Sequence, residues 1–263
     1  MEQTKRLQQI LLKIIKDIDS LCTQNNIKYY LLGGSALGAI RHQGFIPWDD
    51  DLDIIMDCEN YDKFINVCKQ SLDPNKYYLQ ERLFDWPLAF SKVKLKNTRL
   101  IEIEGYDDHK DNGIYIDVFR FDNVSSNKLV SYWQYFCGKV FLSYTLSQRK
   151  YKSASLKKKI FMALSFPLKY KFIREFVLHQ TAMYNNKKTA YYGMFYGRGN
   201  YRTAVVAREI FGTPIYVPFE DMQLPVPEKC HEYLQQTFGD YMKLPPVEQR
   251  QGLHCISVDF GEY

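Results

Sequence analysis

The sequence predicts a core of the α/β or α+β class, of which we adopt α+β, a mixed β-sheet flanked by helices, followed by a largely helical C-terminal part. Strand-like and helix-like segments are interspersed over the first 125 residues. From residue 128 to about residue 185, aromatic residues and lysines recur with helical spacing, and six prolines follow from residue 214 onward. We therefore expect a core over residues 1–125, with residues 126–263 packed on it and ending in a proline-rich tail.

The first element is an amphipathic helix over residues 4–26. Its apolar residues recur at steps of three and four, the spacing of one helical face: Leu7, Ile10, Leu11, Ile14, Ile15, Ile18 and Leu21. A short buried strand over residues 27–32 and a Gly-Gly-Ser turn over residues 33–35 follow. Residues 36–42 are then expected to form a short helix that begins at this turn.

The remaining elements of the core follow from period-two alternation for strands and from helical spacing for one further helix. The expected strands cover residues 51–56, 77–80, 89–95, 98–104 and 113–119, and the expected helix covers residues 59–69. In the C-terminal part we expect two or three helices over residues 128–185, a loop or irregular strand over residues 191–202, and turns around one helix at residues 228–238.

Composition indicates an ordinary globular protein. Of the 263 residues, 46% are hydrophobic and 25% are charged, as in typical soluble domains. The net charge of +5 suits a phosphate-bearing substrate or an anionic membrane surface, but is too small to argue for nucleic acid. The first 20 residues do not resemble a signal peptide, no apolar run of about 18 residues occurs, and the six cysteines form no CxxC pair. We therefore expect a cytoplasmic protein with free thiols.

Four acids crowd into five positions, and the apolar residues 54–56 follow them directly. On a strand, Asp51 and Asp53 would share one face, about 6–7 Å apart, with Leu52 on the other. Carboxylates held together repel one another and need a cation, and Mg²⁺ (or Mn²⁺) prefers such oxygen ligands. Asp117, a lone acid in an apolar strand, is the expected third ligand, and Asp49 a possible fourth.

The Gly-Gly-Ser turn supplies a complementary feature. Glycine allows close backbone approach, and the helix that follows offers unpaired N–H groups to an anion, so Gly33, Gly34 and Ser35 are candidate phosphate contacts. Taken singly, such a turn is often only a turn, and a run of aspartates is often a solvated loop. Together with the acid pair and Asp117 they predict metal-dependent phosphoryl or nucleotidyl transfer.

At these residues the sequence resembles the LicD family of the nucleotidyltransferase-fold superfamily. The resemblance covers nearly the whole chain and rests on LLGGSALGAIRHQGFIPWDDDLDIIM, KVKLKNT, IYIDVF and FGDYMKLPP. It implies a nucleotidyltransferase-like catalytic core and a cytosolic phosphotransferase. Such an enzyme moves a phospho-alcohol, phosphocholine in the best-known case, from a CDP-activated donor to a hydroxyl of a cell-surface glycan, such as a capsule, polysaccharide or teichoic acid, or of its lipid-linked precursor. Relatives include the fukutin-related ribitol-phosphate transferases.

The family pattern maps onto residues of this chain one by one. It aligns its Gly-Ser element with Gly34 and Ser35, and its acids with Asp51, Asp53 and Asp117, so that the first two acids hold the metal. Asp117 then either completes the coordination or accepts the proton of the acceptor hydroxyl. Arg41 is a candidate nucleotide contact. Lys92 and Lys94 either neutralise the leaving CMP or belong to a solvated strand face.

Other interpretations of the sequence stay open. An NTP-dependent nucleotidyltransferase acting on a small molecule, or a binding protein of this fold without activity, would carry similar motifs. The lysine-rich helical region suits either a solvated face or peripheral membrane contact. Adjacent pairs at Cys230–His231 and His254–Cys255 are a weak zinc candidate. The sequence leaves open which alcohol and which sugar are used, the oligomeric state, and which carboxylate is the general base.

Overall fold

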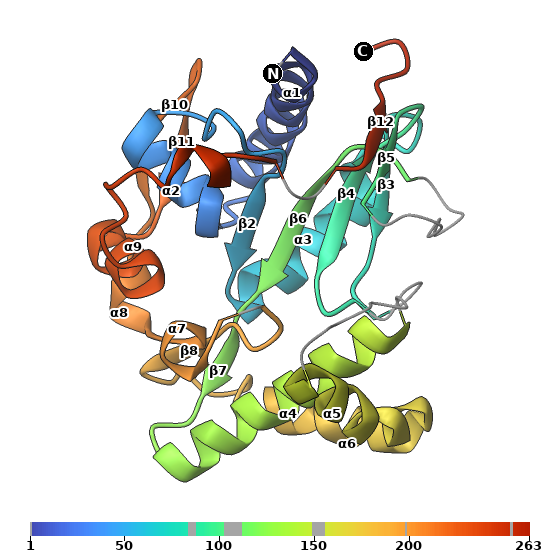
Figure 1. Ribbon diagram of the computed structural model, residues 1–263, viewed down its shortest axis with the longest axis vertical. Coiled ribbons are helices and arrows are strands. Elements are labelled where there is room, and N and C mark those ends of the chain that lie inside the picture. The colour runs from blue at the N-terminus through green and yellow to red at the C-terminus, as the bar shows by residue number, and fades with distance from the viewer. Residues whose placement is uncertain (1, 84–87, 103–111, 149–155, 198, 253–254) are drawn as a thin grey trace.

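The computed structural model describes residues 2–83, 88–102, 112–148, 156–197, 199–252 and 255–263 (Figure 1). At its centre lies a five-stranded mixed sheet with the order β1-β2-β6-β4-β3. Its strands are β1 (Tyr30–Leu31), β2 (Asp53–Met56), β6 (Tyr115–Arg120), β4 (Ser91–Leu95) and β3 (Tyr77–Gln80). The strands β2 and β6 run parallel, and the other neighbouring pairs run antiparallel. The expected α+β class is confirmed.

The strand register decides which side chains share a face of the sheet. Asp53 of β2 is paired with Asp117 of β6, which is paired in turn with Lys92 of β4. Because paired residues point to the same side, these three residues lie on one face. Their apolar neighbours along the strands, including Ile54 and Ile116, point to the opposite face.

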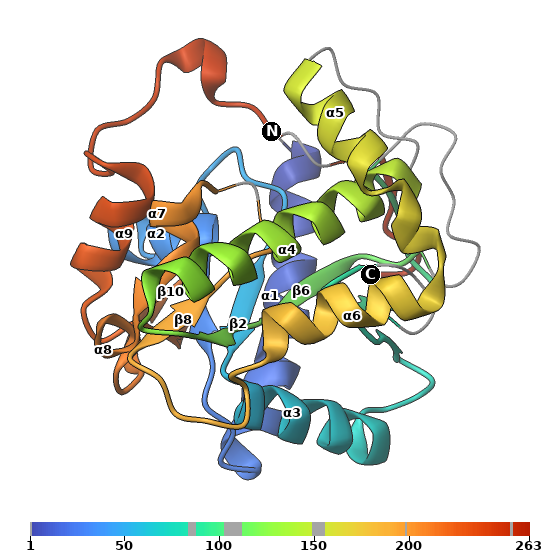
Figure 2. The same cartoon turned by 90° about the horizontal axis from the view of Figure 1, so that it is seen from below.

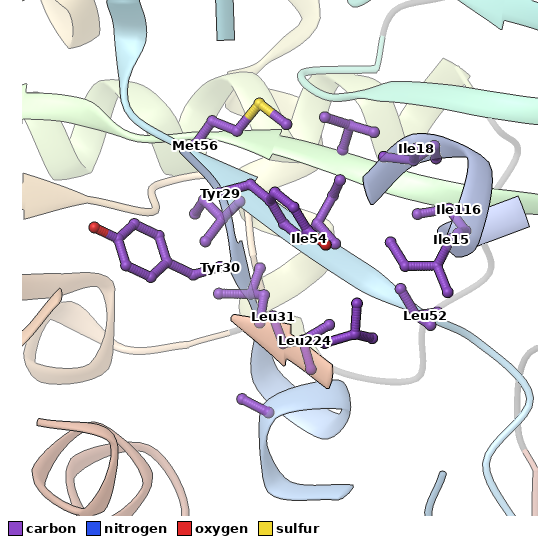
Figure 3. Packing of buried hydrophobic residues seen from close by; sticks show 14 of the residues in the cluster. Ile15, Ile18, Tyr29, Tyr30, Leu31, Leu52, Ile54, Met56, Ile116 and Leu224 are labelled. Carbon is purple, nitrogen blue, oxygen red and sulfur yellow. The ribbon is translucent and has the colours of Figure 1, made fainter. Parts of the chain in front are cut away.

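Two helices cover the apolar face, α1 (Glu2–Gln24) and α3 (Cys58–Ser71). Figure 3 shows Ile15 and Ile18 of α1 beside Ile54 and Ile116 of the sheet, and all four side chains are buried. The predicted periodicity of the first helix is confirmed, since every residue of its apolar stripe except the partly buried Leu21 is buried. The polar face of the sheet is left to carry the candidate site.

Two elements begin at different residues from those the sequence predicts. Helix α2 (Gly33–His42) starts at Gly33, so the Gly-Gly-Ser segment is its first turn and not a preceding one. Strand β2 starts at Asp53, so Asp51 and Leu52 precede it. The predicted strand at residues 77–80 has the bounds of β3, whereas that at residues 98–104 is the shorter β5 (Arg99–Ile101), with residues 103–104 outside the described ranges.

The C-terminal part contains more strand than the sequence predicts. A three-stranded sheet joins β7 (Asp122–Val124), β8 (Tyr191–Gly193) and β9 (Val205–Ala207), and β12 (Ser257–Asp259) pairs with β5. Strands β10 (Ile215–Phe219) and β11 (Met222–Val226) form a hairpin. Its prolines, Pro218 and Pro225, suggest turns in the sequence. They are tolerated because a strand of a two-stranded sheet has an open edge where no N–H is needed.

The helices of this part are of two kinds. A long helix and its neighbours form a layer at the lower end of Figure 1, and Figure 2 shows them from below. They are α4 (Lys128–Gln148), α5 (Leu156–Leu164), the 3₁₀ turn η1 (Phe166–Lys169) and α6 (Lys171–Ala182). Shorter segments complete the chain: α7 (Tyr201–Ala204), α8 (Arg208–Phe211), α9 (Cys230–Phe238) and the 3₁₀ turn η2 (Val247–Gln249). Within the described ranges, no helix combines the length and apolarity needed to cross a bilayer.

One hydrophobic cluster joins residues from both sides of position 125. Phe211, which is fully buried, lies 5.2 Å from Tyr30, 4.6 Å from Phe121 and 5.2 Å from Tyr233, measured between ring centroids. Tyr192 stacks on Phe121 at 4.4 Å. Aromatic burial of this kind makes the folding of residues 126–263 depend on the sheet. The predicted division of the chain into two parts at residue 125 therefore stays a prediction.

Replacing Phe211 with alanine is therefore expected to lower the free energy of unfolding by about 3–5 kcal/mol, the cost of truncating a buried phenylalanine. Urea unfolding followed by circular dichroism and by tryptophan fluorescence should give a single, coincident transition. The control is Phe172→Ala, because the Phe172 side chain is 71% exposed and its loss should leave stability nearly unchanged. Two separated transitions in the wild-type protein would contradict the joint core.

Candidate active site

Two carboxylates from neighbouring parallel strands form the centre of the candidate site. Asp53 is the first residue of β2, and Asp117 is its direct partner on β6. The Asp117 N–H donates to the carbonyl of Leu52 at 3.1 Å, and the Asp53 carbonyl accepts from the N–H of Leu32 at 3.0 Å. Strands in such a pair lie about 4.8 Å apart, so the two side chains stand next to one another on the polar face.

The acids influence one another strongly. Burial, the charge of Asp51 and then those of Asp117 and Asp49 raise the pKa of Asp53 well above its ordinary 3.8. Burial raises the pKa of Asp117 to about 6, with Lys92 opposing the shift and Glu102 and Asp51 adding to it. The predicted site acids are thus brought together. Asp53 and Asp117 lie on adjacent strands, whereas Asp51 lies just before β2.

Lys92 is the cation nearest to Asp117 among the contacts of the described residues. Its Nζ lies 3.5 Å from Asp117 Oδ1, 3.6 Å from Glu102 Oε1 and 3.3 Å from the centre of the Tyr115 ring. The Tyr115 hydroxyl in turn donates to Glu102. Lys92 and Lys94 are both buried, so they do not form a solvated strand face. A buried cation beside a carboxylate and an aromatic ring is held in one place.

The other acids of the run have separate surroundings. Asp49 lies against the start of α2, because a Cβ built on Gly34 would come within 2.9 Å of Asp49 Oδ2. Asp50 is buried and accepts a hydrogen bond of 2.9 Å from the N–H of Cys255. Asp50 therefore fixes the C-terminal segment beside the site, which distinguishes it from Asp49, Asp51 and Asp53.

The first turn of α2 is tied down on both sides. Gly33 has a φ of +54°, which favours glycine, and its N–H donates to the Tyr233 hydroxyl at 3.0 Å. The Ser35 hydroxyl accepts the N–H of Asp53 at 2.9 Å, so it positions the start of β2. The Ser35 N–H donates to Leu32. The Asp49 carboxylate lies beside Gly34, the residue between Gly33 and Ser35.

Arg41 and His42, at the end of α2, lie beside residues that the sequence does not connect with them. Arg41 donates from Nη1 to the Tyr241 carbonyl at 2.6 Å and from Nε to His42 Nε2 at 3.0 Å. Burial, together with the charge of Arg41, lowers the pKa of His42. Trp48 lies 6.1 Å from the His42 ring and 5.5 Å from the Arg250 guanidinium. Arg41 is thus anchored to the C-terminal segment.

Sequence reasoning did not identify Tyr233, Glu102 or Arg250 as neighbours of the site. Tyr233 and Arg250 lie about 200 residues after the residues they contact, and no local pattern marks such a pairing. Glu102 directly follows the short strand β5, a position at which a single acid attracts no notice. The one local signal in the sequence is Trp48, which directly precedes the acid run and contacts Arg250.

The fit of a divalent cation can be tested on the acids themselves. Among the described residues, no three His, Cys, Asp or Glu side chains already converge in metal-ligand geometry. Asp117 Oδ1 is nevertheless buried, and apart from its ion pair with Lys92 at 3.5 Å it accepts no hydrogen bond from a described residue. The neighbouring carboxylates also raise the pKa of Asp53. A hard cation with oxygen ligands would relieve both conditions, so the donor set fits Mg²⁺ or Mn²⁺.

The zinc candidate gains no support from the described residues. Cys230 is a buried free thiol, and His231 Nδ1 is hydrogen-bonded to the Tyr241 hydroxyl at 2.9 Å. Cys255 is also a free thiol, whereas His254 lies outside the described residues. Buried free thiols are expected for all six cysteines. All six are free, and Cys22, Cys68, Cys137 and Cys230 are buried, whereas Cys58 and Cys255 are only partly buried.

A mixed sheet that presents acids from two parallel strands, with a glycine-initiated helix beside them, is the arrangement of a nucleotidyltransferase-type domain. A comparison with family models agrees, since residues 26–150 match the family described as "LicD/FKTN/FKRP, nucleotidyltransferase domain". The chain is also 30% identical over 261 residues to the lipopolysaccharide cholinephosphotransferase LicD of Haemophilus influenzae, which covers 95% of this chain and 96% of that protein. The chain belongs to the LicD family.

Two shorter matches involve uncharacterized proteins of Rickettsia. The protein of Rickettsia typhi is 34% identical over 128 residues, 43% of this chain and 40% of its own. The protein of Rickettsia prowazekii is 59% identical over 44 residues, 17% of this chain and 16% of its own. Because both proteins are described as uncharacterized, these matches give no information about activity.

Replacing Asp53 with asparagine is expected to stabilise the metal-free protein at pH 7, because burial and the neighbouring carboxylates raise the pKa of Asp53 in the folded state. An acid whose pKa is raised on folding destabilises the fold while it is ionised. The gain should therefore shrink as the pH falls toward 3.8, the ordinary pKa, below which the folded and unfolded forms are both protonated.

Urea unfolding in EDTA at several pH values measures this difference. The matched control is Asp57→Asn at the other end of β2, where Asp57 caps α3 by accepting the N–H of Asn60. Asparagine caps a helix about as well as aspartate does, so this variant should show little change. A loss of stability in Asp53→Asn at pH 7 would contradict the repulsion that we infer between the acids.

Proposed function

We propose that the protein is a metal-dependent phosphotransferase that moves a phospho-alcohol, in the first place phosphocholine, from a CDP-activated donor to a hydroxyl of a cell-surface glycan or its lipid-linked precursor. The observation that carries the proposal is the pairing of Asp53 with Asp117 in a chain that aligns over 95% of its length with a lipopolysaccharide cholinephosphotransferase. Membership in the LicD family supports the reaction class. The relative from Haemophilus influenzae, a lipopolysaccharide cholinephosphotransferase, supports choline and a lipopolysaccharide acceptor.

The acids are the proposed cation ligands. Asp51 and Asp53 would hold Mg²⁺ or Mn²⁺, with Asp49 as a further candidate, and Asp117 would either complete this coordination or act as the base. When bound, such a cation neutralises charge on the donor diphosphate and on its leaving group. The remaining contributions come from the protein's own side chains and backbone.

Asp117, when it is not a ligand of the cation, is the proposed proton acceptor. With a pKa of about 6, this carboxyl is mostly ionised at neutral pH and still basic enough to take the proton of an attacking hydroxyl. In the proposed step, the acceptor oxygen forms a bond to the donor phosphorus and gives its proton to Asp117. The bond between phosphorus and the CMP oxygen breaks, so that CMP leaves.

The positive groups around the acids have a matching role. Lys92, buried and 3.5 Å from Asp117, is the proposed partner for charge on the phosphates, and Lys94 lies on the same face of β4. The Gly34 N–H at the start of α2 is a proposed phosphate contact. Ser35 acts through its hydrogen bond to Asp53, and Arg41 through its bond to the Tyr241 carbonyl.

The donor and the reaction class are tested by following product release. With CDP-choline, CDP-ribitol and CDP-glycerol as separate donors and a glycan acceptor, we expect Mg²⁺-dependent release of CMP, fastest with CDP-choline. Chelation with EDTA should abolish release. If an NTP instead yields pyrophosphate, the protein is a nucleotidyltransferase. Binding of CDP-choline without turnover on any glycan would make it a binding protein.

Alanine at Asp51, Asp53 or Asp117 should lower the rate of CMP release by a factor of about 100 or more, because each removes a ligand or base. The control variant Asp57→Asn should retain activity. Thermal unfolding gives a second readout, since Mg²⁺ with CDP-choline should raise the melting temperature of the wild-type protein but not of Asp53→Ala. Full activity in any one of the alanine variants would remove that residue from the mechanism.

A further inference from the structure

The outer surface of the α4–α6 layer exposes large apolar side chains in helical rows. On α5, the residues Leu156, Ile160 and Leu164 are all exposed, and they are spaced by four, so they lie along one side of the helix. On α6, the exposed residues Phe172 and Phe176 have the same spacing. More than half of the exposed large apolar side chains of the described residues lie on this layer.

Helix α4 contributes the aromatic residues between these rows. Trp133 and Phe136 are stacked 5.9 Å apart, and Phe136 lies 6.4 Å from Phe161 of α5. The Trp133 indole N–H donates to Gln180 of α6 at 3.0 Å, so the three helices form one connected surface. Figure 2 shows α4 and α6 side by side at this end of the molecule. We call this surface the α4–α6 face.

This region is strongly basic, whereas the rest of the chain is acidic. Residues 128–188 contain 13 lysines and arginines and a single acid, Glu175. The whole chain has a net charge of +5, so the remainder carries a net charge of −7. The lysines are interleaved with the aromatic residues, since Lys169 Nζ lies 4.1 Å from the Phe166 ring and 4.9 Å from the Tyr170 ring.

We propose that the α4–α6 face binds the surface of an anionic lipid bilayer. Contiguous exposed apolar surface marks an interaction site. Aromatic and aliphatic rows bordered by lysine are the composition that inserts at the boundary between headgroups and acyl chains. Charge disfavours a second copy of the chain as the partner of this face, because dimerisation through it would place two strongly basic regions against each other. None of these residues belongs to the acid site.

Sedimentation of the full chain with lipid vesicles, in the absence of any donor, tests this proposal. We expect binding to vesicles of phosphatidylglycerol mixed with phosphatidylcholine, weakening as salt is added, and little binding to phosphatidylcholine alone. The variants F172S/F176S and K159Q/K169Q should each weaken binding about tenfold or more. Brominated lipid should quench wild-type fluorescence, and the quenching should largely disappear in W133F.

Two controls match these variants in chemistry but lie elsewhere. M242S/V247S changes two exposed apolar residues outside the face, and K5Q/K13Q changes two exposed lysines of α1. Both should bind vesicles as the wild-type protein does. Equal weakening in the controls, absence of binding to anionic vesicles, or a dimer in solution that F172S/F176S dissociates would overturn the proposal.

This inference stands apart from the proposed transfer reaction. CMP release with a soluble glycan acceptor, measured on the same variants, should be unchanged. Vesicle binding without CMP release would contradict only the proposed function, and CMP release without vesicle binding would contradict only the membrane surface.

Discussion

The repulsion between Asp53 and Asp117 is the constraint on which the rest of the site depends. Parallel pairing of β2 and β6 holds the two carboxylates on one face of the sheet, and burial deprives them of the water that would screen their charges. A folded protein keeps such a pair only where packing elsewhere compensates for its cost. Here the opposite face of the same two strands is apolar except for Arg120 at the end of β6, and it is covered by α1 and α3. The two strands therefore carry buried apolar packing on one face and repulsion between carboxylates on the other.

The residues that hold this pair in place come from distant parts of the chain. Ser35 positions Asp53 from the start of α2, while Tyr233 of α9 holds Gly33 at the other side of the same turn. Asp50 anchors the segment that contains Cys255. Removal of the C-terminal segment would thus affect the acids through the geometry of α2 and of the loop before β2.

Local patterns predicted much of this architecture. The stripe of α1, the bounds of β3 and the lone acid on β6 follow from periodicity alone, because each depends on neighbours within a few residues. The pattern failed where long-range bonds decide the outcome. The Tyr233 hydroxyl takes the N–H of Gly33, which lets the helix begin at that glycine, and the hairpin of β10 and β11 accommodates Pro218 and Pro225 at positions where a turn was expected. For the same reason, alternation placed Asp51 on the strand, although β2 begins at Asp53.

Charge separation along the chain links the two halves of the molecule. A net charge of +5 conceals a basic helical layer over residues 128–188 and an acidic remainder with a net charge of −7. Opposite charge on the two parts favours their association at long range, whereas the aromatic cluster around Phe211 provides the contact itself. The basic layer also keeps its own apolar rows in solution, because like charge opposes self-association of exposed hydrophobic surface. The acid site with its proposed cation and the basic layer with its proposed anionic surface therefore occupy separate parts of one molecule.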